Sequence, residues 1–213
     1  DMREGQGSYT FSNGASYVGE WKKDKRDGEG IFDWADGNRY EGNWKENKKS
    51  GHGTLIYATG DKYTGEWMND EQHGRGIYMF GDGNVYEGTY VKGQRTGEGI
   101  FTFKNGDKYV GNFLDGNQNG HGTFTWSGGA VYVGEWKDNR QHGKGKYTSA
   151  NGDVYDGDWV DGVMEGEGIL RQADGTKYKG QFRAGMKDGH GIQEDKDGNR
   201  FEGEFRAGEM VGR

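Results

Sequence analysis

The sequence predicts an all-β fold, an elongated and twisted single-layer antiparallel sheet built from tandem β-hairpins. Glycine accounts for 44 of the 213 residues. Such a content disfavours long helices, because each interior Gly costs a helix about 1 kcal/mol relative to Ala. The chain also repeats itself every 23 residues, and all 30 of its aromatic side chains fall on four positions of that repeat. Frequent turns and a strict period are typical of a repeat architecture.

The repeat is seen most clearly when the chain is aligned on the pattern Tyr-x-Gly-x-aromatic. Five positions of this frame hold 42 of the 44 glycines. Nine copies of the pattern occur, and they begin at Tyr17, Tyr40, Tyr63, Tyr86, Tyr109, Tyr132, Tyr155, Tyr178 and Phe201.

One repeat predicts one hairpin. Residues 30–34 have the composition of a strand, residues 35–37 that of a turn ending in Gly, and residues 38–44 that of a returning strand. A three-residue loop with Gly in the left-handed conformation pairs Phe32 with Tyr40 and collects all four aromatic positions on one face. A two-residue loop would divide them between the faces, so we prefer the first.

The segments between hairpins also indicate tight turns. Their third position is always Asp, Asn or Gly, the residue types that tolerate a left-handed backbone. Consecutive hairpins should therefore pair into a sheet of about 18 strands, which would extend roughly 80–90 Å. Gly42 lies between Tyr40 and Trp44, and we expect rings to cover the bare backbone there, so that stacked rings form the core.

Composition restricts the classes of function. The chain has a net charge of -7, no Cys and no apolar run of 18 residues. Nucleic-acid binding is disfavoured, and neither a membrane span nor a secretion signal is expected. We predict a single array over residues 1–213, in the cytoplasm, at the cytoskeleton or at the cytoplasmic face of a membrane. Both ends stop within a repeat, so a piece of a longer protein is expected.

The sequence pattern predicts neither a catalytic site nor a metal site. The five His occupy two repeat positions, and copies of one position lie at least two hairpins apart. A metal ion needs its ligands within ~2 Å, so these His are expected to be solvated. Each Gly-x-Gly precedes an apolar strand and lacks Gly-Lys-Ser/Thr, which excludes a phosphate loop. We expect no catalytic residue, no metal, no cofactor and no enzyme activity.

The repeat resembles the MORN repeat (membrane occupation and recognition nexus). The resemblance rests on Tyr-x-Gly-x-Trp, on the Gly-x-Gly pair and on the hairpin-turn Gly, and it covers nearly the whole chain. Aromatic residues replace the usual Trp at Tyr90, Phe113, Phe182 and Phe205, and Phe201 replaces Tyr. The resemblance implies a non-enzymatic scaffold of cytoskeletal, ciliary or membrane-junction assemblies.

The aromatic face is the first candidate binding surface. Because no second layer is evident in the sequence, a curved trough of rings could bind a protein partner, as an amphipathic helix or an extended peptide. Open sheet edges would also permit homo-oligomers. The predicted partner-binding residues are Tyr40, Trp44, Tyr63, Trp67, Tyr86, Tyr90, Tyr109, Phe113, Tyr132 and Trp136.

A basic ridge supports an alternative function, that of a peripheral membrane module. Basic residues of the first two inter-hairpin segments stack on one sheet edge, and each could contribute about 1 kcal/mol toward an anionic phospholipid surface. A solvated edge or head-to-tail pairing with another copy explains the same charges. Carbohydrate binding is a third interpretation, which lacks the expected aromatic triplets. The ridge comprises Lys22, Lys23, Lys25, Arg26, Lys45, Lys48 and Lys49.

Overall fold

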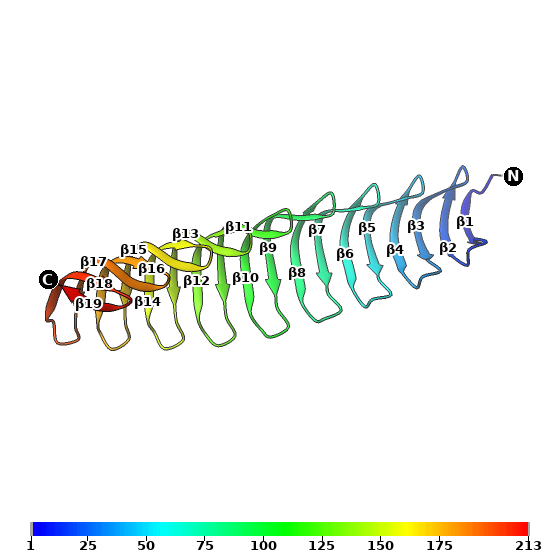
Figure 1. Ribbon diagram of the computed structural model, residues 1–213. Coiled ribbons are helices and arrows are strands. Elements are labelled where there is room, and N and C mark those ends of the chain that lie inside the picture. Colours follow the sequence, from blue (N-terminus) through cyan, green and yellow to red (C-terminus); the bar gives the residue numbers. More distant parts are fainter. Residues whose placement is uncertain (1, 213) are drawn as a thin grey trace. The chain divides into compact units, whose positions relative to one another are not determined.

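Residues 2–212 form β-strands joined by turns. The computed structural model describes residues 2–212, and over that range it has 19 strands, antiparallel pairing and no helix (Figure 1). The chain divides into two compact units. Unit 1 runs to Lys104 and includes Leu114–Gly116, whereas unit 2 contains Asn105–Phe113 and the chain from Asn117 onward. The predicted single array over 1–213, whose two terminal residues lie outside the described range, stays a prediction.

Each unit is an open sheet in which strands pair in chain order. Unit 1 contains β1 (Gly5–Thr10), β2 (Ser16–Lys22), β3 (Lys25–Asp33), β4 (Arg39–Lys45), β5 (Lys48–Ile56), β6 (Lys62–Met68), β7 (Glu71–Met79), β8 (Val85–Val91) and β9 (Gln94–Thr102). Unit 2 contains β10 (Lys108–Leu114) apart from its last residue, β11 (Asn117–Thr125), β12 (Val131–Lys137), β13 (Arg140–Thr148), β14 (Val154–Val160), β15 (Val163–Arg171), β16 (Lys177–Arg183), β17 (Met186–Glu194), β18 (Arg200–Arg206) and β19 (Glu209–Gly212). The all-β fold of tandem antiparallel hairpins is therefore confirmed.

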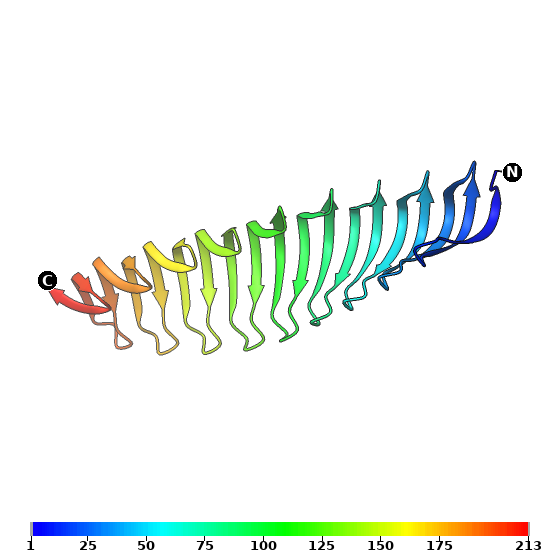
Figure 2. The ribbon, with the colours of Figure 1, turned by 45° about the vertical axis from the view of Figure 1, so that its right-hand side comes forward.

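The hairpin turn is the three-residue type. Phe32 pairs with Tyr40, as predicted, and the loop between them closes with the amide of Trp34 donating to Asn38 O at 2.9 Å. Gly37 has a φ of 90° at the last loop position, where residues other than Gly are disfavoured. In unit 1 these turns lie along one side of the sheet, and the turns between hairpins lie along the other (Figure 2).

The turns between hairpins have two central residues. In the first, Lys23 and Asp24 have φ values of 49° and 64°, which is the backbone of a type I′ turn. The turn brings Lys22 opposite Lys25 and Trp21 opposite Arg26. A register shift between Gly19 and Trp21 marks a β-bulge, and equivalent shifts recur in the following repeats.

Successive turns are joined to one another by Asx side chains. Asn47 Oδ1 accepts the backbone N–H of Arg26 at 2.8 Å, and Asp70 Oδ1 accepts that of Lys49 at 2.8 Å. At the opposite side of unit 1, Asn38 Oδ1 accepts the amide of Ala58 at 2.8 Å. Where the turn carries Gly instead, as at Gly93, the side-chain bond is absent, and the Gly93 backbone N–H donates to Gln72 O at 2.9 Å.

Candidate binding surfaces

One face of each unit, here called the ring face, carries the aromatic side chains, and its floor is built by the Tyr and Trp of the repeat pattern. Tyr40 meets Trp44 at 5.0 Å between ring centroids and Trp67 of the next repeat at 5.4 Å, both edge to face. Such pairs contribute about 0.5–1.5 kcal/mol beyond the burial of area. The tyrosine rings thus link each repeat to its neighbour.

The floor tyrosines lie flat over paired glycines. A Cβ on Gly53 would overlap the ring and hydroxyl of Tyr40, and a Cβ on Gly42 would overlap the backbone of Gly53. The prediction that a ring covers the bare backbone at Gly42 is confirmed. The ring belongs to the tyrosine of the same strand, two residues before the glycine.

The polar tips of the floor rings are satisfied internally. The Tyr40 hydroxyl donates to Asn43 O at 3.0 Å, and the Trp44 indole N–H donates to Gly30 O at 3.2 Å. Burial raises the pKa of Tyr86 to about 12 and raises the pKa of Tyr40 as well. Phenols held neutral in this way keep donating their hydrogen bonds over the whole physiological pH range.

All ten residues predicted to contact a partner belong to this floor and are buried. None is more than 5% exposed, so the rings offer little of their own surface to another molecule. Their burial makes them the core of the sheet. Whether they bind a partner stays a prediction. The ten are Tyr40, Trp44, Tyr63, Trp67, Tyr86, Tyr90, Tyr109, Phe113, Tyr132 and Trp136.

A second row of rings is the more accessible part of the ring face. We call these residues the rim rings, and each is only half-buried. Trp34 packs at 4.6 Å from Phe32, and Phe80 packs at 4.5 Å from Tyr78. The sequence marks this position as aromatic in six repeats, which is the signal that could have selected it. The rim rings are Phe11, Trp34, Tyr57, Phe80 and Phe103 in unit 1 and Trp126 in unit 2.

A row of long side chains covers the floor rings at the end nearer the type I′ turns. The guanidinium carbon of Arg26 lies 4.3 Å from the Trp44 ring centroid, and Lys49 Nζ lies 4.2 Å from that of Trp67. Burial lowers the pKa of both Arg26 and Lys49. The cover residues are Arg3, Arg26, Lys49, Gln72 and Arg95 in unit 1 and Gln118, Gln141, Met164, Lys187 and Met210 in unit 2.

Recesses open between the rim rings and the cover residues. In unit 1 a recess of about 220 Å³ lies among Gln72, Tyr78, Phe80, Tyr90 and Arg95. In unit 2 a recess of about 310 Å³ is lined by the rim ring Trp126 and by Gln141, Tyr147, Trp159 and Met164. Each of the last four lies 69 residues after its counterpart in the recess of unit 1. Because that offset is three repeats, these four residues of the two recesses occupy the same positions of the repeat.

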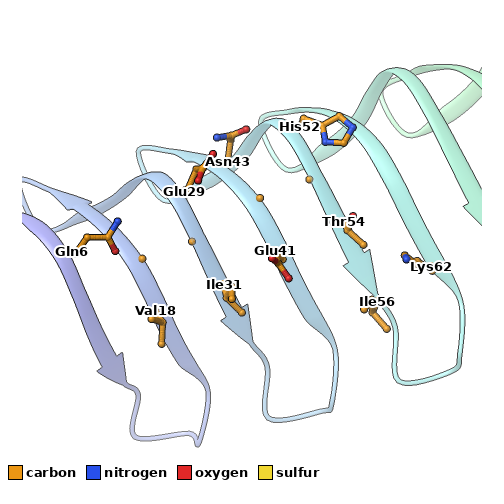
Figure 3. A pocket seen from close by; sticks show the side chains of 14 residues that line it. Gln6, Val18, Glu29, Ile31, Glu41, Asn43, His52, Thr54, Ile56 and Lys62 are labelled. Atoms are coloured by element: carbon orange, nitrogen blue, oxygen red, sulfur yellow. The ribbon is translucent and has the colours of Figure 1, made fainter.

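The opposite face of unit 1 has a wider and more polar hollow of about 770 Å³. Paired glycines, among them Gly30 and Gly42, expose the backbone at its centre. Val18, Ile31 and Glu41 point into it from β2, β3 and β4 (Figure 3). Carboxylates, aliphatic groups and amides mix on this face, as expected for the wetter side of a single sheet.

The seven ridge residues do not share one face. Arg26 and Lys49 pair with Trp21 and Trp44 and lie on the ring face. Lys22 and Lys25, which pair with each other, project to the opposite face and are exposed. Lys45 and Lys48 form the equivalent exposed pair, and Lys23 is exposed within the type I′ turn. Lys25 also approaches the Glu46 carboxylate at 3.4 Å.

Over residues 2–212 no group of three or more His, Asp and Glu side chains is arranged to hold a metal ion. None of these residues forms a helix with the length and apolar character of a membrane span.

The MORN repeat pattern matches the chain from end to end. The matched segments are residues 1–16, 17–39, 40–62, 63–85, 86–108, 109–131, 132–154, 155–177, 178–200 and 201–213. The chain is a MORN-repeat protein. Each complete MORN segment begins at the floor Tyr and contains the two-residue turn, one long strand and the three-residue turn.

A solved structure shares this fold at low sequence identity. The TCP10 domain of CPAP from Danio rerio is 11% identical, with a TM-score of 0.52, 92% of this chain covered and 93% of that chain. The TCP domain of Drosophila melanogaster SAS-4, in complex with a proline-rich motif of dSTIL, is 13% identical, with a TM-score of 0.46 and coverage of 73% and 85%. No curated protein sequence matches this MORN-repeat chain.

The MORN repeats of this chain differ in how firmly the floor is bonded. Indole N–H groups donate to strand carbonyls at Trp67, Trp136 and Trp159, with donor to acceptor distances of 3.1, 3.2 and 3.0 Å. Phe182 and Phe205 occupy this position in later MORN repeats and cannot donate such a bond. The repeats with Phe at this position, Phe113 of β10 included, therefore lack this hydrogen bond.

Proposed function

We propose that this MORN-repeat chain is a non-enzymatic scaffold that binds a protein partner along its ring face. The single observation that carries the proposal is the periodic recess between the rim rings and the cover residues, which recurs three repeats apart in the two units. Half-exposed aromatic rings supply interface energy at a low entropic cost. Because the rim rings and the cover residues recur in every repeat of unit 1, this surface suits an elongated segment rather than a small molecule.

The floor and the rim have separate roles in this proposal. The buried floor rings hold the sheet rigid, and the rim rings with the cover residues make the contacts. A rigid surface lowers the cost of binding, because little order has to be gained on association. The domain of CPAP from Danio rerio, which shares the fold, has been solved in complex with a peptide of STIL. That complex is consistent with a peptide as the partner here.

The test compares the rim rings with the opposite face of the sheet. Trp34→Ser with Tyr57→Ser removes two rim rings, and Ser occupies the equivalent position at Ser149, so the fold accepts it. Val18→Thr with Ile31→Thr is the matched control on the opposite face, where Thr64 and Thr54 are the natural equivalents. We expect partners captured by the intact chain in proximity labelling to be lost with the rim variant and retained with the control.

The outcome that contradicts the proposal is equally specific. Retention of every partner by the Trp34→Ser, Tyr57→Ser chain, with circular dichroism showing an intact fold, would remove the ring face as the binding surface. Loss of partners only with the Val18→Thr, Ile31→Thr chain would transfer the function to the opposite face.

A second candidate function is binding of anionic phospholipid, and one observation favours it. Lys22, Lys25, Lys45 and Lys48 are exposed and project together from the opposite face at neighbouring positions of β2 to β5. Clustered lysines are attracted to anionic bilayers with a strong dependence on salt. Vesicles of phosphatidylserine and phosphatidylcholine should sediment the intact chain at low salt but not the variant with these four Lys changed to Gln. Equal sedimentation of both chains would remove this candidate.

A further inference from the structure

The two rows on the ring face of unit 1 recur at a fixed interval. One repeat contributes two strands, and neighbouring strands lie about 4.8 Å apart, so the same position returns about every 9.6 Å across the sheet. Trp34 and Tyr57 are consecutive rim rings, and Arg26 and Lys49 are consecutive cover residues. Lys49 Nζ lies only 5.8 Å from the Trp34 ring centroid, so one slender segment can contact both rows.

The interval selects the conformation of a bound segment. A polyproline II helix advances about 3.1 Å per residue with three residues per turn, so equivalent side chains recur about every 9.3 Å and point the same way. In a β-strand three residues span about 10 Å but reverse the side chain. Seven residues of an α-helix span about 10.5 Å and fall out of step by about 1 Å at each repeat. Polyproline II is the regular conformation that stays in register.

The cover residues select the charge of the segment. Neither Arg26 nor Lys49 has a carboxylate within ion-pair distance among residues 2–212, and the described bonds of the Arg26 side chain are to Asn47. Asp70 acts on both cations, but its Oδ1 is engaged by the Lys49 backbone N–H at 2.8 Å. Two partly desolvated cations without ion-pair partners favour a ligand that supplies carboxylates.

We propose that unit 1 binds a proline-rich acidic segment in the polyproline II conformation, with one turn of three residues on each MORN repeat. Prolines pack on the rim rings Trp34 and Tyr57, carboxylates at every third residue meet Arg26 and Lys49, and the third side of the helix faces solvent. This inference rests on the proposed function and adds the conformation, period and charge of the partner.

The probe is a synthetic peptide of about five Pro-Glu-Ser triplets, which keeps the three-residue period. Its control has identical composition, shuffled so that neither Pro nor Glu recurs at every third position. Both are titrated calorimetrically into the full chain. We expect the triplet peptide to bind about tenfold more tightly than the shuffled peptide, because only the former aligns all its contacts at once.

Variants of the chain test the charge. Arg26→Gln with Lys49→Gln should weaken binding of the triplet peptide by about tenfold, since both carboxylate contacts are lost. Gln72 and Gln141 occupy the equivalent position, so the substitution suits the fold. Lys22→Gln with Lys48→Gln removes the same charge from the opposite face and should change the affinity by less than about twofold.

The failures of the inference and of the proposed function are distinguishable. No binding of the triplet peptide, equal binding of the shuffled peptide, or no effect of Arg26→Gln with Lys49→Gln overturns the inference. Tighter binding of an acidic amphipathic helix overturns it also. In each of these cases the proposed function survives if protein partners still depend on Trp34 and Tyr57, and it fails if they do not.

Discussion

The phenol of Tyr40 occupies the space in which a side chain on Gly53 would lie. The two residues belong to adjacent strands, and the same relationship joins Tyr63 to Gly76 in the next repeat. The core of this protein therefore consists of rings lying on bare backbone, and a single layer suffices to bury them.

Gly53→Ala should destabilise unit 1. The added methyl group overlaps the Tyr40 ring, which is enclosed and cannot move aside, and overpacking of this kind costs about 1–3 kcal/mol. The midpoint of chemical denaturation, followed by circular dichroism, measures the effect. Gly128→Ala is the control, since no atom lies within 4 Å of its Cβ and its φ is not positive. Equal midpoints for the two variants would contradict the close approach.

The fold should be lost at alkaline pH. Burial raises the pKa of Tyr17, Tyr86 and Tyr178 to about 12, above the ordinary tyrosine value of 10.0. Because the folded pKa is the higher one, the stability contributed by these phenols is complete below about pH 10 and declines as the pH rises toward 12. Tyrosinate absorbance and circular dichroism should change together in that window. Ionisation of these tyrosines near pH 10 with the sheet intact would disprove the prediction.

The Asx bonds between successive turns should be transferable. Asn47→Gly keeps a residue suited to the φ of 71° but loses the bond to the Arg26 amide, and we expect a cost of about 1 kcal/mol. Gly93→Asn makes the reverse change at a φ of 75° and should protect the amide of Gln72. Amide hydrogen exchange at Arg26 and Gln72 measures both. Unchanged exchange at Arg26 in Asn47→Gly would show that the side-chain bond contributes nothing.

Lys49 should stabilise unit 1 by covering Trp67 rather than by its charge. Lys49→Ala uncovers the ring and should cost about 1 kcal/mol. Lys49→Met keeps the cover without a desolvated charge and should cost almost nothing, since Met164 and Met210 occupy the equivalent position. Denaturation midpoints and tryptophan fluorescence distinguish the two. A loss in Lys49→Met as large as in Lys49→Ala would assign the effect to the charge.

Much of the fold could be predicted because the repeat makes local rules visible nine times. Each hairpin turn ends in a Gly, such as Gly37, and this residue type indicates a left-handed conformation. That conformation sets the turn type, which pairs Phe32 with Tyr40 and places the rings on one face. The left-handed Asp24 likewise indicated the second turn, and the structure adds that Lys23 is also left-handed. The left-handed conformations of Gly37 and Asp24 were therefore accessible from residue type alone.

The division of the ring face into floor and rim was not accessible in the same way. It depends on the bulge between Gly19 and Trp21 and on Arg26 lying over Trp44, which no composition rule specifies. A two-residue turn at Lys23 and Asp24 pairs Arg26 with Trp21 and therefore places Arg26 on the ring face. The division of the basic ridge between the two faces could thus have been predicted from the turn length. The exposed fraction of each ring can be known only from the side-chain positions themselves.

The Asx bonds also join residues that lie only about one repeat apart in the sequence. Among the described side-chain hydrogen bonds, the widest sequence separation is the 22 residues between Asn117 and Asn139. Partners so close in the chain meet quickly, and nothing must wait for a distant segment. During synthesis, each hairpin can be locked in place as soon as the next one leaves the ribosome, so the growing chain never exposes more than about one unfinished repeat.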